Sequence, residues 1–129
     1  MRKTARMSAF QVLFGYDQGN SDGEQTLSML VQENELTAKD IEYVHFIIQQ
    51  YEQHKNEIDE IIARHLTKQW SLARLGAVER TILRLGALEI LFVDDVPQRV
   101  AINEALEMAK LFADHQSTAI INGVLDKIN

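Results

Sequence analysis

Apolar residues recur along most of this chain at spacings of three and four, which is the period of an amphipathic helix. No stretch shows the strict alternation of a half-buried strand, and the single proline, Pro97, leaves long segments able to form helices. The first helix is predicted over roughly residues 3–17, where Phe10 and Phe14 share an apolar face. A polar stretch at residues 17–23 has the composition of a loop and ends it.

A second, shorter helix is predicted over residues 24–33, and a clear start signal follows it. Thr37 and Asp40 have the spacing of a capping box, in which two side chains satisfy backbone N–H groups of the first helical turn. Leu36 and Ile41 stand at the positions of a hydrophobic staple around that start. We therefore expect a third helix to begin here.

The stretch after this start carries two apolar faces, separated by the polar residues 52–57. Val44 and Ile48 belong to the first face, and Ile58 and Ile62 belong to the second. Two packed helices or one kinked helix would both fit this pattern.

Residues 77–92 are the most apolar part of the chain, and their side chains cover most of a helical circumference. Such a helix is surrounded by others, so we expect it at the centre of the bundle. A break at residues 94–97 precedes two more apolar stripes, which predict helices at 102–112 and 120–128. Gly123 inside the last helix costs about 1 kcal/mol relative to alanine, which favours a close helix contact there.

Composition is consistent with one globular domain over residues 1–129. A chain of 129 residues that is 46% hydrophobic can build one shared core. The absence of cysteine excludes a disulfide framework, a thiolate metal site and a thiol nucleophile, and it fits a reducing cytoplasm. No apolar run approaches the ~18 residues of a membrane span, and the N-terminus lacks the apolar core of a signal peptide. We expect a cytoplasmic protein without membrane contact.

The formal charge of −6 is unevenly distributed, because all 19 acidic residues lie beyond residue 16. Arg2, Lys3 and Arg6 lie before them at a helix start, where exposed cations oppose the helix dipole by about 0.3–1 kcal/mol each. Arg2 and Arg6 are one turn apart, so they predict a basic surface on which nucleic-acid phosphates can dock. A frayed, solvated terminus would carry the same charges.

Charged side chains also lie on the most apolar helix, where burial is costly unless they are paired. We expect Arg84 and Glu89 to pair across the bundle or to extend toward solvent. Glu79 and Arg80, near the start of that helix, could equally face a partner.

Candidate chemistry is sparse. Glu42 and His45 have the Glu-x-x-His spacing of half a carboxylate-bridged di-iron site, but the sequence lacks the second copy that such a site requires. We interpret them as a surface pair and predict no metal. The remaining histidines, serines and glycines match no zinc, nucleophile-elbow or phosphate-loop spacing. The residues therefore predict a binding protein without a cofactor rather than an enzyme.

Several linked motifs run along the chain in a fixed order. They are RKTAR at 2–6, QVLF at 11–14, VERTILRLGALE at 78–89, VP at 96–97, VAINEA at 100–105, AK at 109–110 and NGVLD at 122–126. In this order and spacing they resemble the NusB family of transcription antitermination factors, from near the first residue to the last.

The resemblance implies an all-α fold, a compact bundle of about seven helices in two packed sub-bundles. It implies binding to boxA-type RNA in the leader transcripts of ribosomal RNA operons, together with NusE, a ribosomal small-subunit protein. It also implies loading onto RNA polymerase as part of an antitermination complex that resists termination.

Residue by residue, the resemblance assigns RNA binding to Arg2, Lys3, Arg6, Phe112, Gln116 and Ile120. It assigns the NusE-binding surface to Phe14 and Glu79. Gln116 replaces an acid and Ile120 a phenylalanine that are often found in the family. Because isoleucine cannot stack on a base, a contact at Ile120 would be apolar packing.

Two alternatives remain open at this point. The chain could be a helical protein-interaction module that has the NusB fold but binds RNA weakly or not at all. It also resembles the N-terminal domain of ribosomal RNA cytosine methyltransferases, although 129 residues leave no room for their catalytic domain. The oligomeric state is open as well, because a NusB-like protein could bury its RNA surface in a homodimer and release it on binding.

Overall fold

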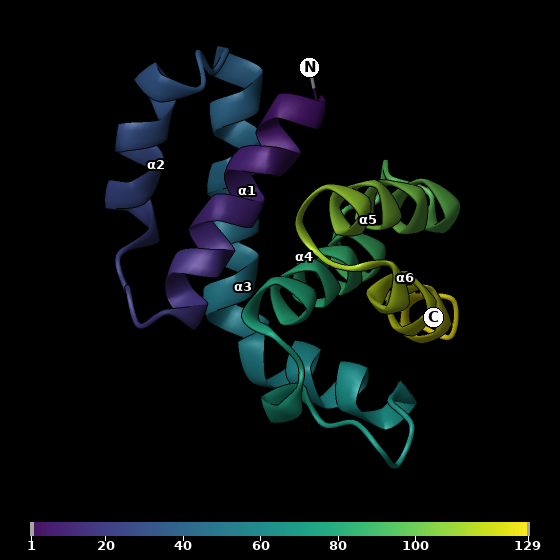
Figure 1. The fold of residues 1–129 in the computed structure, drawn as a ribbon. Coiled ribbons are helices and arrows are strands. Elements are labelled where there is room, and N and C mark those ends of the chain that lie inside the picture. Colours follow the sequence, from purple (N-terminus) through teal and green to yellow (C-terminus); the bar gives the residue numbers. More distant parts are fainter. Residues whose placement is uncertain (1, 129) are drawn as a thin grey trace. The chain divides into compact units, whose positions relative to one another are not determined.

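A computed structural model describes residues 2–128, and all regular elements within that range are helices (Figure 1). They are α1 (Arg2–Asp17), α2 (Gly23–Glu33), α3 (Ala38–His65), the 3₁₀ helix η1 (Leu72–Arg74), α4 (Ala77–Phe92), α5 (Gln98–Phe112) and α6 (His115–Leu125). The all-α prediction is confirmed, with six α-helices and one 3₁₀ helix over these residues where about seven helices were expected. The chain separates into two compact units, Met1–Gln53 (unit 1) and His54–Asn129 (unit 2).

The third element is one continuous helix, α3, of 28 residues, so two separate helices do not form. The polar residues 52–57 contain neither glycine nor proline, and they continue the helix. The predicted capping box is confirmed at its start. The N–H of Asp40 donates to Thr37 Oγ1 at 3.1 Å, and the N–H of Thr37 donates to Asp40 Oδ2 at 3.0 Å. The hydrogen bond from the Thr37 backbone favours the carboxylate and lowers the pKa of Asp40 below its ordinary value of 3.8.

Unit 1 is held by apolar packing and by polar contacts at the helix ends. α1 packs against α2, and Asn34 at the end of α2 donates to Ser8 Oγ at 2.8 Å and to Gln11 Oε1 at 2.9 Å. The Tyr16 hydroxyl donates to the carboxylate of Glu52. Burial and this contact with Glu52 together raise the pKa of Tyr16 above its ordinary value.

Unit 2 is built around α4, which packs against α5 and α6. Apart from Arg84, all residues from Thr81 to Glu89 are buried, which confirms the prediction of a central helix. A Cβ added at Gly86 would lie 2.7 Å from Leu125 Cδ1, so the close approach of α4 and α6 depends on this glycine. The close contact expected at Gly123 is wrong, because a Cβ there would meet no atom within 4 Å.

Polar contacts fix the rest of unit 2. Arg84 binds the Asp59 carboxylate with two hydrogen bonds of 2.8 and 3.0 Å, which confirms the expected pairing. Glu89 is 1% exposed and does not extend to solvent. The side chain of Gln98, in the first turn of α5, donates to the carbonyls of Leu125 and Ile128 at 3.0 and 2.7 Å. It thereby ties the start of α5 to the end of α6.

Candidate nucleic-acid interface

The predicted basic surface at the start of α1 is only partly exposed. Arg2 and Lys3 are exposed, whereas Arg6 is 4% exposed. The guanidinium carbon of Arg2 lies 4.4 Å from the centroid of the Tyr43 ring, within the range of a cation–π interaction. We call the exposed pair Arg2 and Lys3 the basic edge.

The burial of Arg6 has a signal in the sequence. Arg6, Ala9, Phe10 and Leu13 follow the spacing of one helical face, and all four are buried. The side chain of Arg6 is therefore packed inside unit 1 and is almost inaccessible to solvent. The role of Arg6 in RNA binding stays a prediction.

Phe14, assigned to the NusE-binding surface, is half-buried near the end of α1. Its ring stacks on that of Phe10 with the centroids 6.2 Å apart, and Phe10 is itself buried. Only part of the Phe14 ring is therefore accessible to a partner.

Glu79, the other predicted partner residue, is also half-buried and engaged within unit 2. Its Oε2 accepts a hydrogen bond from Ser117 Oγ at 2.7 Å, which joins the first turn of α4 to the first turn of α6. A Cβ at Gly76 would lie 2.5 Å from Oε1, so the glycine makes room for this carboxylate. The binding of a partner by Glu79 stays a prediction.

The three C-terminal RNA residues of the prediction lie at the junction of α5 and α6. Phe112 is the last residue of α5 and is 45% exposed, and its neighbour Leu111 is 69% exposed. Gln116 is exposed, and Ile120, half-buried, lies one turn later on the same face of α6. The structure thus brings Gln116 and Ile120 onto one accessible helix face.

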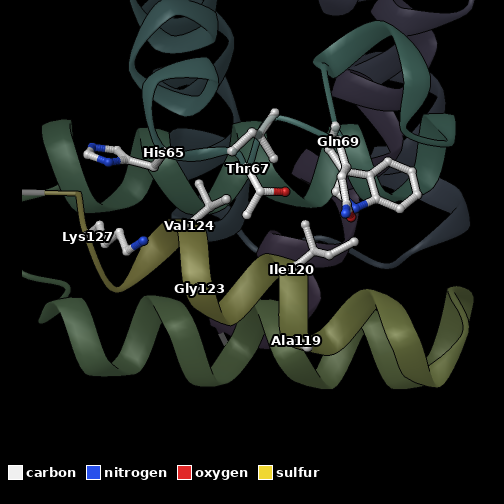
Figure 2. Close-up of a pocket in the computed structure, with 10 residues that line it drawn as sticks. His65, Thr67, Gln69, Ala119, Ile120, Gly123, Val124 and Lys127 are labelled. Carbon is white, nitrogen blue, oxygen red and sulfur yellow. The ribbon is translucent and has the colours of Figure 1, made fainter.

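Ile120 also lines a groove of about 320 Å³, which we call the α6 groove (Figure 2). It is formed by the segment after α3 and by α6. Its lining residues are His65, Leu66, Thr67, Gln69, Trp70, Ala119, Ile120, Gly123, Val124 and Lys127. Trp70 is 39% exposed, so an aromatic surface is accessible beside Ile120.

Hydrogen bonds fix the segment that presents Trp70. Its own N–H donates to the carbonyl of Thr67 at 3.0 Å. Arg74 donates to the carbonyl of Gln69 at 3.0 Å, and Arg80 donates to the carbonyls of Leu72 and Leu75 at 2.8 and 2.7 Å. Arg80 therefore supports this segment from α4, and these hydrogen bonds fix the backbone that carries the indole.

Trp70 is not among the site residues predicted from the sequence, although the sequence carries a signal for it. Residues 61–78 contain three basic side chains and no acidic one, in a chain with an overall excess of acid. The single tryptophan of the protein lies in the middle of this stretch. An aromatic ring between cations is the pattern of a surface for single-stranded nucleic acid.

The Glu-x-x-His pair of α3 does not form a metal centre. His45 Nδ1 lies 2.8 Å from Glu24 Oε2, and Gln49 lies on its other ring nitrogen at 3.2 Å. Over residues 2–128, no group of three or more candidate ligands is placed to hold a metal ion. The helices of the same range include none that is long and apolar enough to cross a membrane.

The fold is all-helical, and the basic edge and the α6 groove present cations and an indole ring, which is the chemistry of a binding surface. Comparison with known proteins agrees, since the model of the NusB family matches residues 3–129. The chain belongs to the NusB family.

Individual relatives match over nearly the full length. The chain is 43% identical over 127 residues to transcription antitermination protein NusB of Oceanobacillus iheyensis, covering 98% of this chain and 97% of that protein. It is 36% identical to the protein of the same name from Bacillus subtilis, covering 98% and 93%.

Solved structures also match over nearly the full length of the chain. NusB of T. maritima superposes with a TM-score of 0.90 at 36% identity, covering 99% of this chain and 89% of that one. A structure of antitermination factors NusB and NusE in complex with double-stranded RNA gives a TM-score of 0.87 at 33% identity, covering 98% and 94%.

Proposed function

We propose that this chain is a transcription antitermination factor that binds boxA-type RNA together with NusE and promotes read-through during ribosomal RNA transcription. The observation that carries the proposal is the match of 98% of the chain to proteins named for this activity. A relative solved with NusE and RNA supports both partners. We treat the two units as parts of one NusB-like domain in the cytoplasm.

The mechanism is one of binding rather than catalysis. Arg2 and Lys3 hold RNA phosphates by charge, and Arg6 supports their helix from its buried position. Trp70 stacks on a base, and Ile120 beside it packs against the same nucleotide. Phosphate contacts position the strand, whereas contacts to bases select its sequence.

NusE adds the second part of the RNA surface in this proposal. Phe14 supplies the accessible part of its ring, and Glu79 supplies a carboxylate at the start of α4, as contacts for NusE. The acidic excess beyond residue 16 suits a basic partner. The joint complex then loads onto RNA polymerase.

The second candidate is an interaction module that binds NusE without RNA. The burial of Arg6 favours it, because only two of the three N-terminal cations are accessible. The aliphatic side chain of Ile120 favours it as well, since it offers no ring for stacking.

Fluorescence anisotropy separates the two candidates. A labelled boxA-type single strand, a scrambled single strand and a boxA-type duplex are titrated with the protein at several salt concentrations, with and without purified NusE. We expect selective binding of the boxA strand that NusE strengthens. The slope of log affinity against log salt should be about −1.4 or steeper, since Arg2 and Lys3 make two phosphate contacts at about −0.7 per contact.

Two other outcomes count against the proposal. Binding of NusE with no RNA affinity in either condition would establish the interaction module. Equal affinity for boxA and scrambled strands in the presence of NusE would remove the sequence selectivity. Sedimentation velocity on the same samples shows whether a homodimer forms and whether RNA dissociates it.

A further inference from the structure

The α6 groove continues beyond the residues that the proposed function uses. Gln69 and Ile120 line one end of it, and His65 and Lys127 line the other (Figure 2). Along the chain, Gly123 lies between Ile120, in the middle of α6, and Lys127, two residues beyond the end of α6 at Leu125. The end of the groove that His65 and Lys127 line takes part in none of the RNA contacts proposed above.

Gly123 has no structural reason to lack a side chain. A Cβ there would meet no atom within 4 Å, in contrast to Gly86, where it would lie 2.7 Å from Leu125. Alanine inside a helix is more stable than glycine by about 1 kcal/mol, so Gly123 weakens α6 without improving its packing. Close approach of a ligand to the backbone is a recognised use of glycine, and this glycine lines a groove.

The groove end beyond Gly123 carries one accessible cation, Lys127, and the imidazole of His65, which can donate a hydrogen bond. Lys127 is exposed and His65 is half-buried. Within residues 2–128, neither side chain takes part in an ion pair or a hydrogen bond. Asp126 is the acidic neighbour on the same turn, whereas Lys68 adds a further exposed cation from the facing segment. Phosphate is the ligand that suits this end of the groove.

We propose that a second nucleotide of the bound single-stranded RNA lies over Gly123, with its phosphate against Lys127 and His65. The inference rests on the proposed function, because Trp70 and Ile120 hold the nucleotide before it. RNA is favoured over a peptide because the groove combines an indole, bare helix backbone and cations, and residues 61–78 contain no acid. Gly123 thus determines how far along α6 the strand can run.

The test compares Gly123→Leu and Lys127→Ala with matched controls. Asn56→Leu introduces the same new side chain, and Lys55→Ala makes the same change as Lys127→Ala, at exposed positions of α3 in unit 2 that do not line the groove. All variants, the wild type and Trp70→Ala are titrated with the labelled boxA-type strand in the presence of NusE. Melting temperature is measured by circular dichroism for each variant.

We expect Gly123→Leu to weaken RNA binding by about fivefold or more, as for the loss of one base contact. Its melting temperature should equal or exceed that of the wild type, because leucine is the better helix former and its Cβ meets open space. Lys127→Ala should make the salt slope shallower by about 0.7, as for the loss of one phosphate contact. Both controls should bind as the wild type does.

Three outcomes would overturn the inference, and they can be told apart. Wild-type affinity and slope in Gly123→Leu and Lys127→Ala, with weakened binding in Trp70→Ala, would remove the second subsite and leave the proposed function intact. Loss of NusE binding alone in Gly123→Leu would make the groove a protein-docking surface. A wild-type protein that binds no RNA would overturn the proposed function together with the inference.

Discussion

The basic edge of unit 1 and the α6 groove of unit 2 offer different chemistry to a ligand. At the basic edge, Arg2 and Lys3 present charge, and the Tyr43 ring under Arg2 is only 8% exposed. In the groove, Trp70 presents an indole and Gly123 presents bare backbone. Charge binds any phosphate and weakens with salt, whereas stacking depends on the bases and responds less to salt. Affinity and salt slope together therefore separate stacking at Trp70 from the charge contacts, which are Arg2 and Lys3 at the basic edge and Lys127 at the far end of the groove.

The two surfaces also differ in how the fold uses arginine. In unit 2, Arg74 and Arg80 donate to backbone carbonyls and hold the segment around Trp70. In unit 1, Arg6 is buried in the apolar face of α1, while Arg2 remains exposed one turn earlier. A basic residue near a proposed binding surface can thus serve the ligand or the scaffold, and burial decides which.

The largest effect is expected when the stability of Arg6→Ala is compared with that of Arg2→Ala. Arg6→Ala removes a buried charged side chain and should lower the free energy of unfolding by about 1.5–3 kcal/mol. Arg2→Ala changes an exposed side chain and should alter it by less than about 0.5 kcal/mol. Urea denaturation followed by circular dichroism measures both. Equal stability of the two variants would show that Arg6 belongs to the exposed surface after all.

A somewhat smaller effect is expected from Trp70. Trp70→Ala should weaken binding of the boxA-type strand by about 1–3 kcal/mol and leave the salt slope unchanged, because a stacking contact is lost and no phosphate contact is. Trp70→Phe keeps a ring and should retain most of the affinity. Anisotropy titrations across salt concentrations measure both quantities. A shallower slope in Trp70→Ala would mean that the groove contributes mainly charge, and the contrast between the two surfaces would fail.

Most of the fold could be predicted from the sequence because each helix has its own apolar stripe and its own ends. The capping box at Thr37 and Asp40 and the loop after residue 17 set boundaries that the structure reproduces. The polar residues 52–57 left α3 ambiguous, since a change of polarity does not end a helix unless glycine, proline or a cap accompanies it.

The site could be predicted less well, because accessibility is a property of the packed molecule. Charge alone did not reveal that Arg6 lies on the buried stripe of α1, although its spacing from Ala9 and Leu13 carried that information. Gly123 predicted a close helix contact, but the glycine at which two helices approach closely is Gly86. The basic stretch around Trp70 pointed to a binding surface, but only the fold places the indole beside Ile120.

The smallest effect is the loss of stability at low pH, which we expect to be larger in unit 1 than in unit 2. The folded-state pKa of Asp40 lies below 3.8, so its carboxylate stabilises the start of α3 above that pH, and this contribution is lost as the pH falls through the folded-state pKa. Tyr43, which holds Arg2, lies one turn further along the same helix. Acid should therefore loosen the support of the basic edge, while the groove contains no carboxylate among its lining residues.

Asp40→Asn keeps the shape of the side chain and removes its titration. At neutral pH it should lower the free energy of unfolding by about 1 kcal/mol, the usual contribution of a helix cap. The difference from the wild type should shrink as the pH falls below 3.8, because the wild-type side chain then becomes neutral as well. All three tyrosines lie in unit 1 and the single tryptophan in unit 2, so near-ultraviolet tyrosine signals and tryptophan fluorescence report on the units separately during urea denaturation. A difference in the free energy of unfolding between Asp40→Asn and wild type that stays constant with pH would show that the capping hydrogen bonds do not depend on the charge of Asp40. An acid response of the tryptophan signal equal to that of the tyrosine signals would show that the two units do not differ in their sensitivity to low pH.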